Sequence, residues 1–269
     1  GRIASHLQQR AWPGDEPMGM LGDYDPLRDK YEPLVATPTE QALTAFALFR
    51  FARTPGVGVA NATRASRSAL RIIDDFQSVA EGAEEPLTLQ TASAGYIVAM
   101  LEATTRPPGM TPVAAMGDAF WEQALGALRG HCSPTGEWSE SLGLGARALS
   151  AYALARVAAS DGVGDETDAS RATSAVRSLF RSTSPGELPT TLPWLGWAEL
   201  MTTARGEQVP AGEGLRDLRA MLWSRQVSPT TVAPGDEDLV GGVWFSAAQN
   251  TFPTWHTLRP ATFAATMFG

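Results

Sequence analysis

Two closely spaced aspartates near the end of the sequence could perform acid–base chemistry. Asp236 and Asp238 are separated by one residue and follow Pro234-Gly235. Carboxylates that are held close together repel each other, which raises the pKa of one and makes it a candidate general acid. A solvated turn after Pro234-Gly235 is the alternative interpretation.

A second acidic pair lies in the first long loop, where Asp23 and Asp25 flank Tyr24. The two carboxylates could act as an acid and a base, or their oxygens could bind a hard cation such as calcium. A simple turn that ends at Pro26 is the alternative interpretation. We therefore take Asp23 as a candidate catalytic residue, and Tyr24 and Asp25 as candidate ligand-binding residues.

A tryptophan, a histidine and an arginine lie together just before the last apolar segment. Trp255-His256 precedes Arg259-Pro260. His256 could transfer a proton near neutral pH. Arg259 could bind an anionic group together with the amides of a helix N-terminus. The alternative interpretation is that these residues cap or brace a long loop.

Other tryptophans could contact a ligand. Trp138 and Trp244 could be platforms for a substrate, although a role as packing anchors is favoured for both. Trp194 and Trp197 are three residues apart on an expected helix, so they share a face that could line a cavity. The candidate ligand-binding residues are thus Tyr24, Asp25, Trp138, Trp244, Trp255 and Arg259, and the candidate catalytic residues are Asp23, Asp236, Asp238 and His256.

The composition excludes some classes of function. The formal net charge is -8 and the pI is near 5.0, whereas a protein that binds duplex nucleic acid needs a concentrated basic face. Nucleic acid is therefore not an expected partner. We also expect no transmembrane segment, because no tract of the sequence is both long enough and apolar enough to span a bilayer.

Metal and cofactor sites are not predicted. The three histidines, His6, His131 and His256, are far apart, so local spacing provides no histidine metal motif. The single cysteine, Cys132, directly follows His131. Adjacent residues on a helix point in different directions, so packing at a helix end is favoured over a zinc site for this pair.

The elements that must position these residues are of two kinds, and the first is an arginine-bearing helix. Arg64, Arg67 and Arg71 recur at spacings of three and four residues, with Ile73 and Phe76 on another face, as expected for an outer helix with one face in water. The neighbouring Asp74-Asp75 is interpreted as solvated charge. The pattern recurs at Arg171, Arg177 and Arg181, and at Arg216 and Arg219.

The second kind is a helix that is apolar over most of its circumference and must therefore be surrounded by protein. Thr37-Pro38-Thr39-Glu40 supplies a cap, a proline at the first helical position and a glutamate at the third. The expected apolar segments are Ala42 to Ala52, Ala94 to Ala103, Ala146 to Ala155, Trp194 to Met201, and Ala261 to Phe268. Their starts, near positions 37, 91, 145, 193 and 258, are spaced by about fifty residues, the length of one helix pair with two loops.

The pattern predicts an all-α fold in which about five helix pairs form an α/α toroid, with apolar inner helices ringed by outer helices. We expect residues 1–269 to form a single toroid domain that is part of a longer protein, because the first helix, Ile3 to Arg10, looks truncated. The loops that enter the inner helices should gather at one end, around amides that have no helical partner. The two long loops, Ala11 to Ala36 and Val227 to Thr257, should carry the site.

Two stretches of the sequence point to a known family. Leu128 to Trp138, with Gly136-Glu137-Trp138, and Trp223 to Phe245, with Gln226 and Gly242-Val243-Trp244, resemble degenerate copies of the glutamine–tryptophan repeat of the terpenoid cyclase and protein prenyltransferase superfamily. The resemblance implies a helical toroid in which these residues join neighbouring helices.

The catalytic motifs of that superfamily are not matched here. Asp236-Glu237-Asp238 and Asp23-Tyr24-Asp25 do not match the Asp-x-Asp-Asp run of a class II cyclase. One cysteine and three scattered histidines do not provide the zinc ligands of a protein prenyltransferase. Family resemblance therefore indicates a fold, and fold alone does not determine function.

Two functional hypotheses follow. The first is a protein that binds a small or extended organic ligand at the mouth formed by the inner-helix N-termini. The second is an acid–base enzyme that acts on an isoprenoid, or on a carbohydrate as a hydrolase or lyase, with Asp23, Asp236, Asp238 or His256 as the proton donor. Helical toroids that act on carbohydrates use separated carboxylates across an aromatic-lined cleft.

Overall fold

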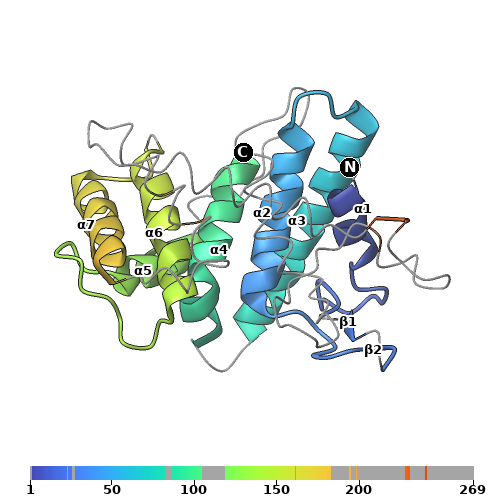
Figure 1. Ribbon diagram of the computed structural model, residues 1–269, viewed down its shortest axis with the longest axis horizontal. Coiled ribbons are helices and arrows are strands. Elements are labelled where there is room, and N and C mark those ends of the chain that lie inside the picture. The colour runs from blue at the N-terminus through green and yellow to red at the C-terminus, as the bar shows by residue number, and fades with distance from the viewer. Residues whose placement is uncertain are drawn as a thin grey trace. The chain divides into compact units, whose positions relative to one another are not determined.

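Within the part of the chain that the structure describes, the fold is all-α apart from one very short hairpin. The computed structural model describes residues 2–22, 24–25, 28–82, 87–104, 119–160 and 162–182, with a few residues beyond them (Figure 1). The elements are α1 (Arg2–Gln9), β1 (Tyr24–Asp25), β2 (Lys30–Tyr31), α2 (Pro38–Arg53), α3 (Val59–Gly82), α4 (Leu87–Thr104), α5 (Ala119–His131), α6 (Leu144–Ala158) and α7 (Glu166–Ser182). No helix in this described part is long and apolar enough to cross a membrane.

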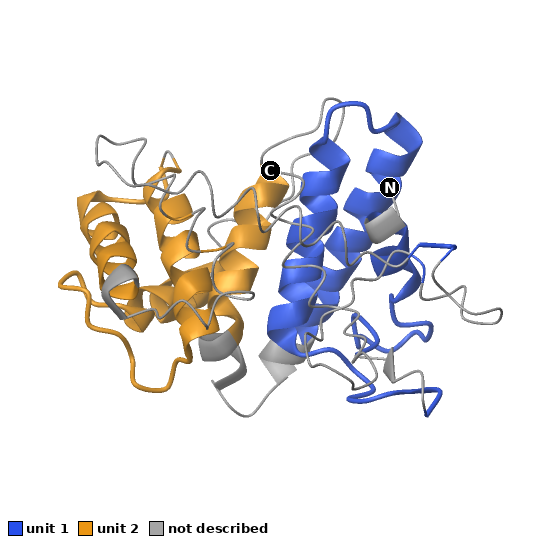
Figure 2. Cartoon of the chain, in the orientation of Figure 1, with its two compact units in different colours: residues 1–83, 106–110, 219–269 blue, residues 84–105, 111–218 orange. Residues whose placement is uncertain are grey.

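The chain divides into two compact units, which are coloured differently in Figure 2. Unit 1 comprises residues 1–83, 106–110 and 219–269, and its described elements are α1, the hairpin, α2 and α3. Unit 2 comprises residues 84–105 and 111–218, and it contains α4 to α7.

The apolar helix of unit 1 is α2, which packs on both α3 and α1. The side chain of Thr37 accepts the amide of Glu40, while Glu40 reaches back to the amide of Thr37 at 3.0 Å. This capping box, with Pro38 in the first turn, starts the helix as the sequence predicts. Residues 41–49 are then buried on every face, which confirms that this segment is surrounded by protein.

Helix α3 is the expected outer partner of α2. Arg64, Arg67 and Arg71 are exposed, whereas Ile72 and Phe76 on the opposite face are almost completely buried. The alternation of a buried apolar helix with an arginine-bearing helix is therefore confirmed in unit 1.

The first long loop is docked on the helices by polar side chains. Gln41 of α2 donates to the carbonyls of Met18 and Ala36, at 3.1 and 3.0 Å. Asp75 of α3 accepts the amide of Gly19 at 3.1 Å, so its interpretation as purely solvated charge is wrong. The loop also contains the antiparallel β1–β2 hairpin, in which Tyr24 pairs with Tyr31.

Gly19 provides the first testable prediction, because the docked loop requires a glycine there. Its φ is +71°, in the left-handed region, and an added Cβ would collide with the side-chain amide of Gln41. We expect Gly19→Ala to destabilise unit 1 by about 2 kcal/mol, as measured by urea denaturation. Gly58→Ala is the control, since an added Cβ there meets no atom within 4 Å. Equal stability of the two variants would contradict this role for Gly19.

Unit 2 is built around two apolar helices, α4 and α6. Residues 92–103 of α4 and 148–155 of α6 are buried, which confirms two further predicted apolar segments. Helix α5 packs on both of them, and α7 packs on α6. The predicted start of the second apolar segment near position 91 is wrong by one helical turn, since α4 begins at Leu87.

Helices α4 and α6 run parallel to each other. Ser93 of α4 and Ser150 of α6 both contact the ring of His131. Glu102 lies about 13 Å beyond Ser93 along α4, and Arg156 lies about 9 Å beyond Ser150 along α6. These two side chains also contact each other. Contacts that advance in the same direction on both helices require a parallel pair. Helix α5 thus follows α4 and precedes α6 in the chain and packs on both of these parallel apolar helices.

Candidate functional site

The structure describes only some of the residues that the sequence proposes for a site. The backbones of Tyr24 and Asp25 form β1, and Trp138 follows α5. The remaining candidates lie outside the described residues and stay predictions: Asp23, Asp236, Asp238, Trp244, Trp255, His256 and Arg259.

Trp138 lies at the end of a tight turn, which we define as residues 132–138 and call the Trp138 turn. Cys132 and Trp138 form an antiparallel bridge across it. The amide of Ser133 donates to the carbonyl of Glu137 at 2.9 Å, and the hydroxyl of Ser133 accepts the amide of Glu137 at 3.0 Å. Gly136 allows the chain to reverse, because its φ is +91°. The turn is therefore a defined structure and not a loose loop.

The indole of Trp138 is the unusual feature of this turn. The side chain is half-buried, and its Nε1 is a buried donor with no hydrogen-bond partner in the structure. A buried donor without an acceptor costs about 1–3 kcal/mol. Such groups are rare, and each calls for an explanation such as a bound water, ion or ligand.

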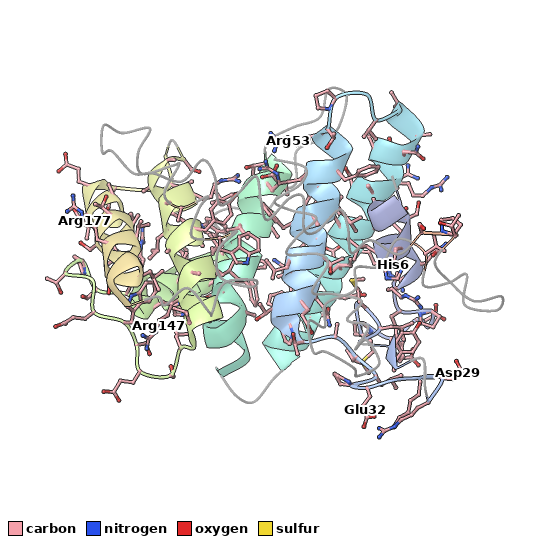
Figure 3. The ribbon with its side chains drawn as sticks, viewed as in Figure 1. His6, Asp29, Glu32, Arg53, Arg147 and Arg177 are labelled. Atoms are coloured by element: carbon pink, nitrogen blue, oxygen red, sulfur yellow. The ribbon has the colours of Figure 1, made fainter. Side chains whose placement is uncertain are left out.

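The turn leads into the N-terminus of α6, which differs from that of α2. Gly143 is the N-cap residue of α6 and forms no side-chain hydrogen bond to the first turn. Arg147, in this first turn (Figure 3), directs Nη2 to the carbonyl of Ser139 at 3.5 Å, and its Nε is buried without a partner. The start of the apolar helix α6 thus combines amides that no side chain caps with a guanidinium and an indole that retain unused donors.

Comparison of the chain with protein-family models, with curated proteins and with solved structures finds no match.

Cys132 is not a nucleophile in this setting. Its side chain is buried, and burial raises the pKa of the thiol to about 11 even though Arg171 and Arg147 act to lower it. At neutral pH the sulfur therefore remains a thiol, which is a poor nucleophile and a poor metal ligand. Among the described residues, no group of three or more His, Cys, Asp or Glu side chains is placed to hold a metal ion.

His131 packs at the end of α5, as the sequence favours. Its Nδ1 lies 2.7 Å from the hydroxyl of Ser150, and its Nε2 lies 3.4 Å from the hydroxyl of Ser93. All three side chains are buried. The imidazole therefore joins α4, α5 and α6 through hydrogen bonds, and solvent does not reach it.

Two charged clusters of unit 2 were missed by the sequence analysis. In the first, the buried carboxylate of Asp168 accepts Nε and Nη2 of Arg129, at 3.0 and 2.6 Å, and Nη1 of Arg171 at 3.0 Å. Burial alone would raise the pKa of Asp168, but the hydrogen bonds and charge of Arg129, with help from Arg171, lower it. Arg171 is therefore not the solvated outer-helix residue that its spacing suggests.

The second cluster lies between the two apolar helices. Nη1 of Arg156 donates to Oε2 of Glu102 at 2.9 Å and to the hydroxyl of Tyr152 at 3.1 Å. The Glu102 side chain is 1% exposed and that of Arg156 is 14% exposed. The ring of Tyr152 also packs on Trp194, with a centroid distance of 5.4 Å. Glu102 is the single charge of the predicted segment Ala94 to Ala103, and Arg156 directly follows the predicted segment Ala146 to Ala155. These opposite charges were the available signal that the two segments pair.

Proposed function

We propose that the chain is a helical toroid, similar in fold to the terpenoid cyclases and protein prenyltransferases, that binds an organic ligand at the N-terminal mouth of its inner helices. The observation that carries the proposal is the buried, unpartnered indole N–H of Trp138 in the turn before inner helix α6. An acceptor oxygen on a ligand would remove the cost of leaving that donor unsatisfied.

The packing of the inner helices favours binding at the mouth. The described middle segments of α4 and α6 are buried on every face, so a ligand does not reach them from solvent. A ligand would therefore meet the helix ends, where the Trp138 turn and Arg147 lie. An acidic group on such a ligand could also be attracted by Arg147 and by the uncapped amides of α6.

Catalysis stays a second hypothesis with its own requirement. An enzyme acting on an isoprenoid or a carbohydrate would need a proton donor, and the candidates Asp23, Asp236, Asp238 and His256 lie outside the described residues. The buried carboxylates of unit 2, Asp168 and Glu102, are each paired with arginine. For Asp168, the hydrogen bonds and charge of Arg129 lower the pKa, so this carboxylate is unsuited to donate a proton.

Fluorine NMR of protein labelled with 5-fluorotryptophan can test ligand binding at Trp138. Trp138→Phe removes one resonance and so assigns it. We expect farnesol, a probe for an isoprenoid, or maltohexaose, a probe for a carbohydrate, to shift the Trp138 resonance in a saturable way. The resonance of Trp121, about 15 Å from His131 along α5, serves as an internal control.

The two probes give distinct outcomes. A saturable shift with one probe alone supports the proposal and identifies the ligand class. If neither probe moves the Trp138 resonance at millimolar concentration, or if Trp121 moves equally, the proposed mouth site is wrong.

A further inference from the structure

The Trp138 turn is held in place by the outer helix α7. Nε of Arg171 donates to the carbonyl of Cys132, the first residue of the turn, at 2.9 Å. At the tip of the turn, Gly136 lies so close to α7 that an added Cβ would be 3.0 Å from the carbonyl oxygen of Ser174. One helix thus supports both the base and the tip of the turn, from residues far away in the sequence.

Arg171 is itself fixed by Asp168. Its Nη1 donates to Oδ1 of Asp168, and the two carboxylate oxygens of Asp168 also accept Nε and Nη2 of Arg129 on α5. Asp168 is completely buried and is tied to the start of α7, because its amide donates to Asp165 at 2.8 Å and its carboxylate accepts the Asp165 amide at 3.3 Å. The guanidinium of Arg171 therefore has both of its ends engaged and little freedom to turn away from Cys132.

We propose that Arg171 is the positioning residue of the candidate ligand site: it sets the place of the Trp138 indole by holding the carbonyl of Cys132 against α7. This inference rests on the proposed function for its biological meaning, but the structural claim can be tested without any ligand. Removing a group that orients a binding residue typically weakens ligand affinity about tenfold or more.

The test uses the full chain labelled with 5-fluorotryptophan, first without ligand. Arg171→Met retains most of the apolar stem of the side chain but removes the guanidinium fork. We expect this change to shift or broaden the Trp138 resonance while the Trp121 resonance stays in place. Arg177→Met is the matched control, since Arg177 is exposed on the same helix (Figure 3), and it should leave both resonances unchanged.

Arg171→Lys provides the second variant if Arg171→Met fails to fold. A single ammonium can bind Asp168 or the carbonyl of Cys132 but cannot reproduce the fork that reaches both. We expect a smaller displacement of the Trp138 resonance in this variant than in Arg171→Met, with the fold retained. A Trp138 resonance that stays at its wild-type position in a folded Arg171 variant would overturn the proposal.

Titration of the same variants with farnesol and maltohexaose separates this inference from the proposed function. If Arg171 positions the site, the probe that binds the wild-type chain should bind Arg171→Met about tenfold more weakly. If neither probe binds the wild-type chain but the ligand-free Trp138 resonance still depends on Arg171, the proposed function fails and the positioning role stands. Equal affinity of wild type and Arg171→Met would show that Arg171 does not set the binding geometry.

Discussion

Replacing Arg156 with methionine is expected to destabilise unit 2 by about 3–5 kcal/mol, the usual cost of removing one partner of a buried ion pair. Methionine fills much of the same volume, so the change removes charge more than packing. The Glu102 carboxylate, which is 1% exposed, would lose its guanidinium between α4 and α6. Urea denaturation followed through the Trp121 fluorine resonance measures the effect.

A double-mutant cycle distinguishes this electrostatic cost from a loss of packing. Combining Arg156→Met with Glu102→Gln should recover a large part of the lost stability, because a buried pair replaced on both sides is far less costly than a broken pair. Arg67→Met, at an exposed position of α3, is the surface control and should change stability by less than about 0.5 kcal/mol. If the double variant is no more stable than Arg156→Met, the buried pair is not the source of the loss.

Replacing Asp168 with alanine is expected to cost unit 2 about 3 kcal/mol. The change removes the acceptor of two guanidinium groups and the carboxylate that accepts the Asp165 amide at the start of α7. This expected loss of stability is at the lower end of the range for a broken buried ion pair, because the Arg129 side chain is 32% exposed and can be partly solvated. Glu166→Ala, an exposed acid in the same helical turn, should cost less than about 1 kcal/mol.

The contribution of the Asp168 charge should also depend on pH in a defined direction. The pKa of Asp168 in the folded protein lies below its ordinary value of 3.8, so its ionised form stabilises the fold above that value. This stabilisation is lost as the pH falls from 3.8 through the lowered pKa. The stability difference between wild type and Asp168→Asn should therefore be constant above about pH 5 and shrink below about pH 4. A difference that grows on acidification would contradict the assignment.

The apolar helices could be predicted from the sequence because their signals are local. Thr37, Pro38 and Glu40 together define the start of α2, and the absence of charge from Ala42 to Phe49 predicts its burial. Helix α4 begins one turn before the predicted start at Thr91, because Leu87 does not follow a comparable set of signals.

The contacts that hold the Trp138 turn in place could not be predicted from the sequence, because they join residues that are far apart in the chain. Arg171 reaches the carbonyl of Cys132 across 39 positions, as Arg129 reaches Asp168. Spacing alone places Arg171 on a solvated helix face, although it is largely buried. The spacing of Asp165 and Asp168 was a readable capping signal, but it did not indicate that two arginines would share the carboxylate. Trp138 was identified from its motif, while its unpartnered indole became apparent only in three dimensions.

The parallel alignment of α4 and α6 brings two like electrostatic poles together. Both helices end with the partial negative charge of the helix dipole, and the acidic residue Glu102 lies in the last turn of α4. Arg156, in the last turn of α6, is the cation that offsets all three. Repulsion between the C-terminal ends of α4 and α6 would oppose their parallel packing. The guanidinium of Arg156 offsets this repulsion.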